Sequence, residues 1–461
     1  MKKKLGGGTM VMGAALAALG LSMPMHAAAQ VASPPPAATE EDEATDGTKP
    51  QTSTEQGQTP IDESFGARTH ADWVRETRRK AWEDTKWDIQ LRSYTLIRDK
   101  FDGSETEGWA VGGWAGAKTG YFRERFAFGA TAYGSVPVSA PEDKDGTLLL
   151  KPGGDGYGVL GELYVEALLN DDIRLSVGRR GIDTPYINRN DNRMTPNTFE
   201  QITLQGLHGG GKGEAEWRWG GGFFNRIKER NSDEFVSMAE DAGALDGVER
   251  GVYALGGNYK KGNFSFGAIN YYSDDIINIF YTETKYAIPL SEAMRLSFAF
   301  QYTDQTSTGD ELLKGFAFDS RQWGAKSELG YKGLLLTAAY TSAGGNANMQ
   351  GPWSGYPGYT SVQVEDFNRD GEDAWLLRAG YNFASVPGLS MYGLYVDGSK
   401  PDAASEYAKS EYDLNLQWAP PEGTFKGLQV RLRYGEVSQD DPANSKLDDL
   451  RIMVYYVLPQ F

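Results

Sequence analysis

Arginine side chains recur at alternate positions along several short segments of this chain of 461 residues. In an extended segment successive side chains point to opposite faces, so Arg431 and Arg433 share one face while Val430 and Leu432 share the other. A guanidinium can hold a carboxylate through two parallel charge-assisted hydrogen bonds, and several guanidiniums in series would bind an anion without one deep trap. The same pattern holds for Arg92, Arg98, Arg295 and Arg378. The alternative is that these arginines brace a wall by pairing with acids on the same faces, such as Asp88, Glu216 and Asp413.

Histidine chemistry has few candidates. The chain has three histidines, of which His70 lies in a polar N-terminal segment and His208 directly precedes the run 209–211 of three glycines. An imidazole beside a glycine turn is typical of a turn residue, so a histidine-based hydrolase would have almost no candidate general base.

A metal site is also a weak hypothesis. Residues 366–371 (DFNRDG) match the opening of a calcium-binding loop, but the twelfth position is Leu377 where a bidentate glutamate is required. The segment also leads into a strand-like run, not a helix. We therefore interpret it as a polar loop with a glycine-enabled turn, and the sequence predicts neither a metal nor a cofactor.

The composition excludes several classes of protein. The chain has no cysteine, which rules out a disulfide scaffold, a thiolate nucleophile and cysteine-ligated metals. Its formal net charge of −17 argues against a nucleic-acid-binding protein, because the phosphate backbone selects basic faces. The 57 glycines, the 56 aromatic residues (11 Trp, 25 Tyr, 20 Phe) and a mean hydropathy of −0.51 indicate many short strands and turns.

The segments that carry the arginines alternate between apolar and polar residues. In 411–418, Tyr412, Leu414 and Leu416 alternate with Glu411 and Asp413. This pattern predicts half-buried strands, and a soluble sandwich would produce it as well as a membrane barrel. Aromatic residues near the segment ends and turns that alternate between short and long, such as 260–263 and 342–372, favour the barrel.

Eighteen such segments can be counted, which predicts an all-β transmembrane antiparallel barrel of about 18 strands over residues 87–461. A barrel of this size leaves an aqueous channel lined by the polar faces. The expected strands lie near 87–99, 107–118, 124–134, 158–169, 172–180, 201–208, 214–227, 251–260, 263–272, 277–288, 294–305, 320–331, 334–342, 374–383, 389–397, 411–419, 427–437 and 449–458.

The N-terminal part has the features of an export signal followed by a polar segment. Three lysines, an apolar run and the small residues at 27–29 predict a signal peptide over residues 1–29, whose removal would leave a net charge of −20. Residues 30–86 form an acidic segment rich in proline and threonine, with a short amphipathic helix expected over 72–86. No internal run is apolar enough for a transmembrane helix.

Six stretches of the chain, in order, resemble the outer-membrane porin D (OprD) family of substrate-selective porins. The resemblance covers roughly residues 86–461. The stretches are LRSYTLIRDKFD (91–102), SVGRRGIDTPYINRNDNRMTPNTFE (176–200), NRIKERNSDEF (225–235), SVQVEDFNRDGEDAWLLRAGYNFA (361–384), VPGLSMYGLYVDG (386–398) and the final LRIMVYYVLPQF.

The resemblance implies a pore narrowed by two infolded loops, 181–200 and 343–373, with a ladder of arginines on one wall facing an acidic pocket. It places the ladder on Arg92, Arg98, Arg179, Arg180, Arg378, Arg431, Arg433 and Arg451. The constriction residues would be Arg189, Arg193, Ser361, Glu365 and Asp366. The chain departs from the family at Val364, where a tyrosine is expected, and at Glu162 and Glu166, where a more basic face is expected.

The expected function is facilitated diffusion of small carboxylate-bearing or zwitterionic solutes, such as amino acids or organic acids, across the outer membrane of a Gram-negative bacterium. The expected partners are these solutes, outer-membrane lipid and lipopolysaccharide, and the barrel-assembly machinery through Phe461, with the chain a monomer or weak trimer and not an enzyme. The alternatives are an adhesin or structural barrel with a closed lumen, a barrel hydrolase and, less favoured because the chain is too short for a plug and 22 strands, a TonB-dependent transporter.

Overall fold

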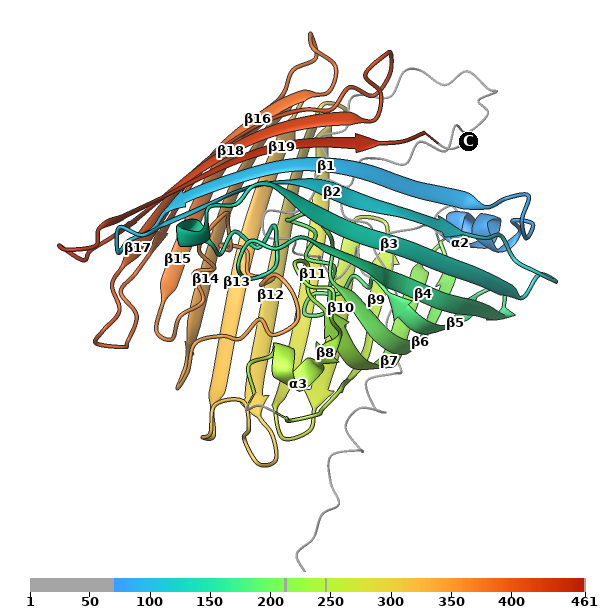
Figure 1. The fold of residues 1–461 in the computed structure, drawn as a ribbon, viewed down its shortest axis with the longest axis horizontal. Helices are drawn as coiled ribbons and strands as arrows, with labels where there is room; N and C mark the ends of the chain where they lie inside the picture. The colour runs from blue at the N-terminus through green and yellow to red at the C-terminus, as the bar shows by residue number, and fades with distance from the viewer. Residues whose placement is uncertain (1–69, 211–213, 245–246, 460–461) are drawn as a thin grey trace, which may run out of the picture.

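The computed structural model describes residues 70–210, 214–244 and 247–459. Within these ranges eighteen strands form one closed antiparallel barrel, as the alternating pattern predicts (Figure 1). The barrel strands are β1 (Lys86–Asp99), β2 (Glu105–Lys118), β3 (Phe126–Ser139), β4 (Tyr157–Asn170), β5 (Ile173–Arg180), β6 (Thr198–Gly209), β7 (Glu216–Lys228), β9 (Val252–Lys261), β10 (Phe264–Ser273), β11 (Ile277–Ser291), β12 (Met294–Ser307), β13 (Asp319–Tyr331), β14 (Leu334–Gly345), β15 (Asp373–Asn382), β16 (Leu389–Gly398), β17 (Lys409–Trp418), β18 (Leu428–Gln439) and β19 (Lys446–Val457).

The remaining elements are short. They are the strand β8 (Val236–Ser237), the helices α2 (His70–Thr77) and α3 (Met238–Asp241) and the 3-10 helix η2 (Glu142–Lys144). No helix in the described part of the chain has the length and apolar content that crossing a membrane requires. The predicted signal peptide, the acidic segment as far as residue 69 and Phe461 lie outside the described residues.

Each barrel strand pairs with its neighbours in sequence, and the first strand closes the barrel by pairing with the last. β1 pairs with both β2 and β19, and Arg92 lies opposite Tyr455 in this closing register. β8 pairs only with β7, which also pairs with β9, so β8 does not interrupt the ring. The closed ring leaves none of the barrel strands with an unpaired edge.

Side chains alternate between the lumen and the outside along each strand. In β17 the predicted polar face is buried, with Glu411 and Asp413 at 0% exposure, while Leu414 and Leu416 are exposed on the outer face. The exposed outer face carries two aromatic girdles, as a membrane barrel requires. One contains Trp87, Phe126, Phe264, Tyr286, Tyr331, Tyr381 and Tyr456; the other contains Trp109, Tyr253, Tyr272, Trp323, Tyr340, Trp375 and Tyr412.

The two ends of the barrel differ in the length of their connections. One end carries short turns such as 171–172, 262–263, 292–293 and 332–333, and we call it the short-turn end. The opposite end carries long loops, among them 140–156, 181–197, 229–251 and 346–372. Several of these loops fold into the lumen, because their apolar residues form buried clusters with inward-facing strand residues.

Candidate functional site in the barrel lumen

The loop 181–197, which connects β5 and β6, is fixed to strand β1 by a buried ion pair. Arg92 of β1 donates from both terminal nitrogens to the carboxylate of Asp191, at 2.6 and 2.7 Å. Its guanidinium lies between the rings of Trp114 and Tyr455, at 4.3 and 4.4 Å from their centroids. Arg92 is therefore an anchor of this loop, and it faces the lumen as predicted.

The middle of the same loop packs against the second long loop. The buried Tyr186 makes edge-to-face contacts with Tyr271 of β10 and Tyr356, at 5.9 and 6.1 Å between centroids. Ile187 forms an isolated backbone bridge with Trp353 of loop 346–372. The two loops that the resemblance assigns to a constriction thus meet inside the barrel.

The second loop is held on β17 by hydrogen bonds from its backbone. The carboxylate of Glu411 accepts from the N–H groups of Val364 and Glu365, at 2.7 and 2.8 Å. Asp413 accepts from the N–H of Gln363 at 3.1 Å. Val364 thus helps to hold the loop through its backbone N–H, a contact that does not depend on its side chain.

The predicted acidic residues of the second loop, Glu365 and Asp366, are consecutive and lie shortly before β15. Glu365 forms an ion pair with Lys409 at 2.8 Å, and the hydroxyl of Ser361 donates to Asp366. Burial raises the pKa of Asp366 to about 6, against the opposing effect of the Ser361 hydrogen bond. In the described part of the chain, no group of three or more histidine, aspartate or glutamate side chains is arranged to hold a metal ion.

Several of the predicted arginines form ion pairs with acids of the wall or of loop 181–197. The sequence alone did not identify Asp449, although it lies two residues before Arg451 and so shares its face. Glu200 and Asp183 were also not identified. The pairs are Arg98 and Arg451 with Asp449 at 2.7 and 2.6 Å, Arg179 with Glu200 at 2.8 Å, Arg180 with Glu166 at 2.8 Å, and Arg189 with Asp183 at 3.0 Å.

Three other predicted arginines gather around one tyrosine of β16 and one asparagine of β17. Arg378 of β15 lies over the ring of Tyr392 at 3.9 Å, and Arg433 of β18 donates to the hydroxyl of the same tyrosine at 3.2 Å. Arg431 donates to the side-chain oxygen of Asn415 at 2.5 Å. These arginines therefore occupy adjacent stations on one arc of the wall.

Arg193 and Arg230 form a second basic group, carried by loops. Both donate to the side-chain oxygen of Asn192, at 3.3 and 2.7 Å. Burial, and then the charges of Arg451 and Arg230, hold the pKa of Arg193 well below its usual value. Within residues 70–210, 214–244 and 247–459, neither guanidinium forms an ion pair with a carboxylate. Arg230 was missed by sequence reasoning because it follows β7 in a loop, where alternation gives no signal.

The acids that depart from the family pattern have specific partners. Glu166 lies between Lys118, Arg174 and Arg180, at 3.0, 3.5 and 2.8 Å. Glu162 accepts from the backbone N–H of Gly181, the first residue of loop 181–197, at 2.7 Å. The basic character expected on this wall is present, but it comes from neighbouring strands.

The two histidines that appeared unrelated in the sequence meet at one carboxylate. His70 and His208 contact the two oxygens of Asp172 at 2.8 and 3.2 Å. The other ring nitrogen of His208 accepts from the indole of Trp219 at 3.2 Å. Burial alone would raise the pKa of Asp172, but the hydrogen bonds from His70 and His208 hold it below its usual value. These contacts fasten helix α2 to the short-turn end, and they occupy both ring nitrogens of His208.

Comparison with known proteins places this fold among porins. A model of the family described as "outer membrane porin, OprD family" matches residues 80–460. Porin D of Pseudomonas aeruginosa is 24% identical over 414 residues, which cover 82% of this chain and 91% of that protein. The porin-like protein GalP of Pseudomonas putida is 22% identical and covers 82% of this chain and 92% of its own length.

Solved structures agree in fold. OccK9 (OpdG) of P. aeruginosa superposes with a TM-score of 0.73 at 23% identity, covering 82% of this chain and 99% of its own. OpdK of P. aeruginosa, solved with vanillate, has a TM-score of 0.70 at 20% identity and covers 82% of this chain and all of its own. From the family match over most of its length, the chain belongs to the OprD family of outer membrane porins, multi-pass β-barrels of the Gram-negative outer membrane.

Proposed function

We propose that this porin is selective for small carboxylate-bearing solutes and passes them by facilitated diffusion along the arginines of the lumen. The pair Arg193 and Arg230 carries the proposal. Two guanidiniums converge there on the neutral oxygen of Asn192, and no carboxylate of the described residues pairs with either. Buried positive charge without a counter-charge is costly, so an anion that enters this site gains two charge-assisted partners.

An acid on the second loop would act on the far end of the solute. The charge of Arg230 is close enough to Asp366 to oppose the rise in the pKa of that carboxyl group, so loop 229–251 and loop 346–372 present opposite charges to one another. A zwitterion would orient with its carboxylate toward Arg230 and its ammonium toward Asp366. Amino acids and organic acids are therefore the solutes to test.

The wall arginines would continue the path. Arg378, Arg431 and Arg433 face the lumen from β15 and β18 and interact with Tyr392 and Asn415. Several stations of moderate strength favour conduction over retention, because a solute must also leave each one. OpdK, which has the same fold, was solved with vanillate, a carboxylate, and this supports a carboxylate as the solute to test.

The test is single-channel current across a planar bilayer, with small carboxylates titrated against uncharged sugars. We expect carboxylates, but not sugars, to block or modulate the current. Arg230→Gln should weaken the block by roughly 10- to 100-fold, since a hydrogen bond to a charged group contributes about 1.5–3 kcal/mol. Arg321→Gln is the matched control, because Arg321 lies exposed on β13.

Two results would contradict the proposal. If sugars and carboxylates affected the current equally, the channel would not be selective for carboxylates. If carboxylates blocked Arg230→Gln as strongly as the parent protein, Arg230 would not be part of the binding site. Folded, inserted protein that gives no current steps would instead support a closed-lumen barrel, which the contact between the two infolded loops makes the alternative to exclude.

A further inference from the structure

The residues before the first strand follow the inner rim of the barrel at the short-turn end. We call residues 70–85 the N-terminal strap. It begins at Asp172 and β6, where His70 is bound, and ends where β1 begins at Lys86. The family match begins at residue 80, so helix α2 precedes the matched part of the chain. In Figure 1 this helix lies beside the ends of the first strands.

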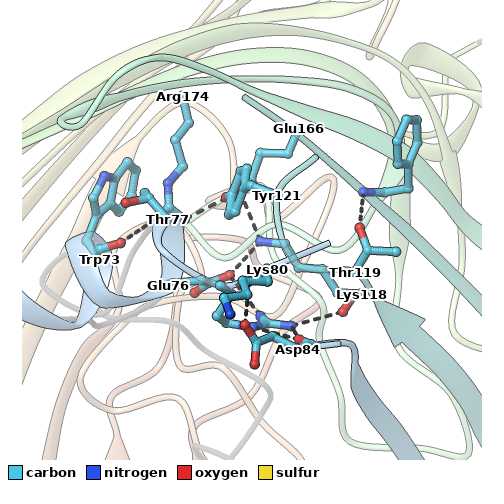
Figure 2. Close-up of polar contacts among 12 residues, drawn as sticks. Trp73, Glu76, Thr77, Lys80, Asp84, Lys118, Thr119, Tyr121, Glu166 and Arg174 are labelled. Carbon is cyan, nitrogen blue, oxygen red and sulfur yellow. Dashed lines mark hydrogen bonds and ion pairs between the residues drawn. The ribbon is translucent and has the colours of Figure 1, made fainter. Parts of the chain in front are cut away.

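The barrel wall binds the strap through specific contacts with its side chains, and we call this binding surface the seat of the strap. Arg174 of β5 stacks on Trp73 at 3.6 Å and donates to its backbone oxygen at 2.8 Å (Figure 2). Trp73 is 4% exposed and its indole donates to the backbone oxygen of Asp171 at 3.1 Å. These contacts hold one face of α2 against the lumen-facing wall.

The seat is also fitted to the backbone of the strap. Lys80 and Tyr121 form a parallel bridge, and the N–H of Gly120 donates to the backbone oxygen of Ala81 at 2.7 Å. A Cβ added at Gly120 would lie 2.4 Å from the backbone oxygen of Lys80. Only a residue without a side chain permits this approach.

A line of ion pairs leads from the strap to the base of the first lumen loop. Glu76 of α2 pairs with Lys118 at 2.6 Å, and Lys118 pairs with Glu166 at 3.0 Å (Figure 2). The other oxygen of Glu166 accepts from Arg180 at 2.8 Å. Arg180 is the last residue of β5 and directly precedes loop 181–197.

The strap supplies half of the negative charge in this cluster. Lys118, Arg174 and Arg180 of the wall and Arg79 of the strap, which lies 3.9 Å from Glu76, contribute four positive charges, and Glu166 and Glu76 contribute two negative ones. Without Glu76, these four cations would share the one buried carboxylate of Glu166. Arg180 is the most exposed of the four cations, with 22% of its side chain accessible, so repulsion would displace it most easily.

We propose that Glu76 is a positioning residue for the lumen constriction, acting through Lys118 and Glu166 on Arg180 at the base of loop 181–197. While the strap is seated, the cluster holds Arg180 on the wall and the loop in its crossing position. Loss of the Glu76 charge releases Arg180 toward the lumen and loosens the loop. This role concerns the passage of ions in general and does not depend on the preference for carboxylates.

The first experiment measures single-channel current in potassium chloride for Glu76→Gln and for Glu76→Gln combined with Lys118→Gln. The single variant raises the net charge of the cluster by one, and the double variant restores it. We expect Glu76→Gln to increase open-channel noise and partial closures several-fold, and the double variant to return them to the level of the parent protein. A purely structural role for Glu76 predicts the opposite, since the double variant loses a further anchor of the strap.

The matched control is Asp72→Asn, which removes the same charge from the same helix. Asp72 is 45% exposed and its ion pair is with Arg75 of α2, so its loss leaves the cluster intact. Parent-like current in Glu76→Gln, an equal response in Asp72→Asn, or a double variant worse than the single one would each overturn the proposal. A heat-dependent shift of mobility on a gel verifies that every barrel is folded.

A second experiment separates seating of the strap from the charge of Glu76. Thr77 is 3% exposed, and the chain has no cysteine, so Thr77→Cys provides one buried thiol on the strap. This thiol should react slowly with a water-soluble thiol reagent in the parent and at least ten-fold faster in Gly120→Ala. The faster variant should also show the noise of Glu76→Gln. Slow labelling in Gly120→Ala, or fast labelling with parent-like current, would overturn the proposal.

Discussion

The role of a charged side chain in this lumen depends more on the group that it contacts than on its residue type. Arg92 is neutralised by Asp191, whereas Arg230 donates to the amide oxygen of Asn192 and forms an ion pair with no carboxylate of the described residues. The first therefore fixes a loop, and the second is where we propose that an anion binds. Alternation in the sequence predicts which arginines face the lumen, but not which acids reach them.

The limits of prediction at this scale follow from distance along the chain. Asp449 and Arg451 lie two residues apart on one strand, so their proximity follows from strand geometry alone. Asp191 reaches Arg92 only because the loop 181–197 crosses the barrel. No local pattern encodes such a crossing, and only the family resemblance indicated that this loop would fold inward.

The carboxyl group of Asp366 predicts a pH-dependent ion preference. Because burial raises its pKa to about 6, the group is charged at pH 7.5 and neutral at pH 5. Lowering the pH should therefore remove one negative charge near Glu365 and Arg230 and shift the reversal potential in a potassium chloride gradient toward anions. Asp366→Asn should show the low-pH preference at both pH values, and an equal pH shift in this variant would assign the effect to another group.

At the scale of elements, the strands could be predicted from the sequence, but the end of helix α2, which is set by a tertiary contact, could not. The expected segments 389–397 and 411–419 match β16 and β17 to within two residues at each end, because the alternation of apolar and polar residues is strong there. The helix expected over 72–86 instead covers His70–Thr77. Beyond Thr77 the backbone oxygens of Arg79 and Ala81 accept hydrogen bonds from the turn after β2, and this tertiary contact replaces the next helical turn.

The second lumen loop depends on one buried tryptophan. Trp353 is 0% exposed and its indole donates to the backbone oxygen of Met238 at 2.8 Å. Trp353→Ala should reduce the stability of the loop by roughly 3–5 kcal/mol, as large-to-small changes in a core do, and should leave the barrel closed. We expect limited proteolysis to cleave loop 346–372 in this variant and not in Phe316→Ala, an exposed aromatic of another loop. Resistance of the loop in both variants would show that Trp353 does not hold it.

At the scale of the whole molecule, the barrel depends on an apolar outer face. Leu414 lies near the middle of β17 and points outward, whereas its neighbour Asp413 is buried in the lumen. Leu414→Arg should destabilise the inserted barrel by about 2–4 kcal/mol, the cost of an arginine on the lipid face at mid-depth. Folding into lipid vesicles, followed by heat-dependent gel mobility in urea, would measure this, with Ala403→Arg in an exposed loop as control. Equal folding of both variants would mean that this face does not contact lipid.

The side chains that surround Arg92 come from parts of the chain that are synthesised at very different times. Trp114 comes from β2, Asp191 from the first lumen loop, and Tyr455 from β19, which pairs with β1 to close the ring. Arg92 therefore cannot make all of these contacts until the last strand, β19, has paired with β1. Fixing of the first lumen loop is therefore coupled in time to closure of the barrel, and an unfinished barrel would hold this loop less firmly than a finished one.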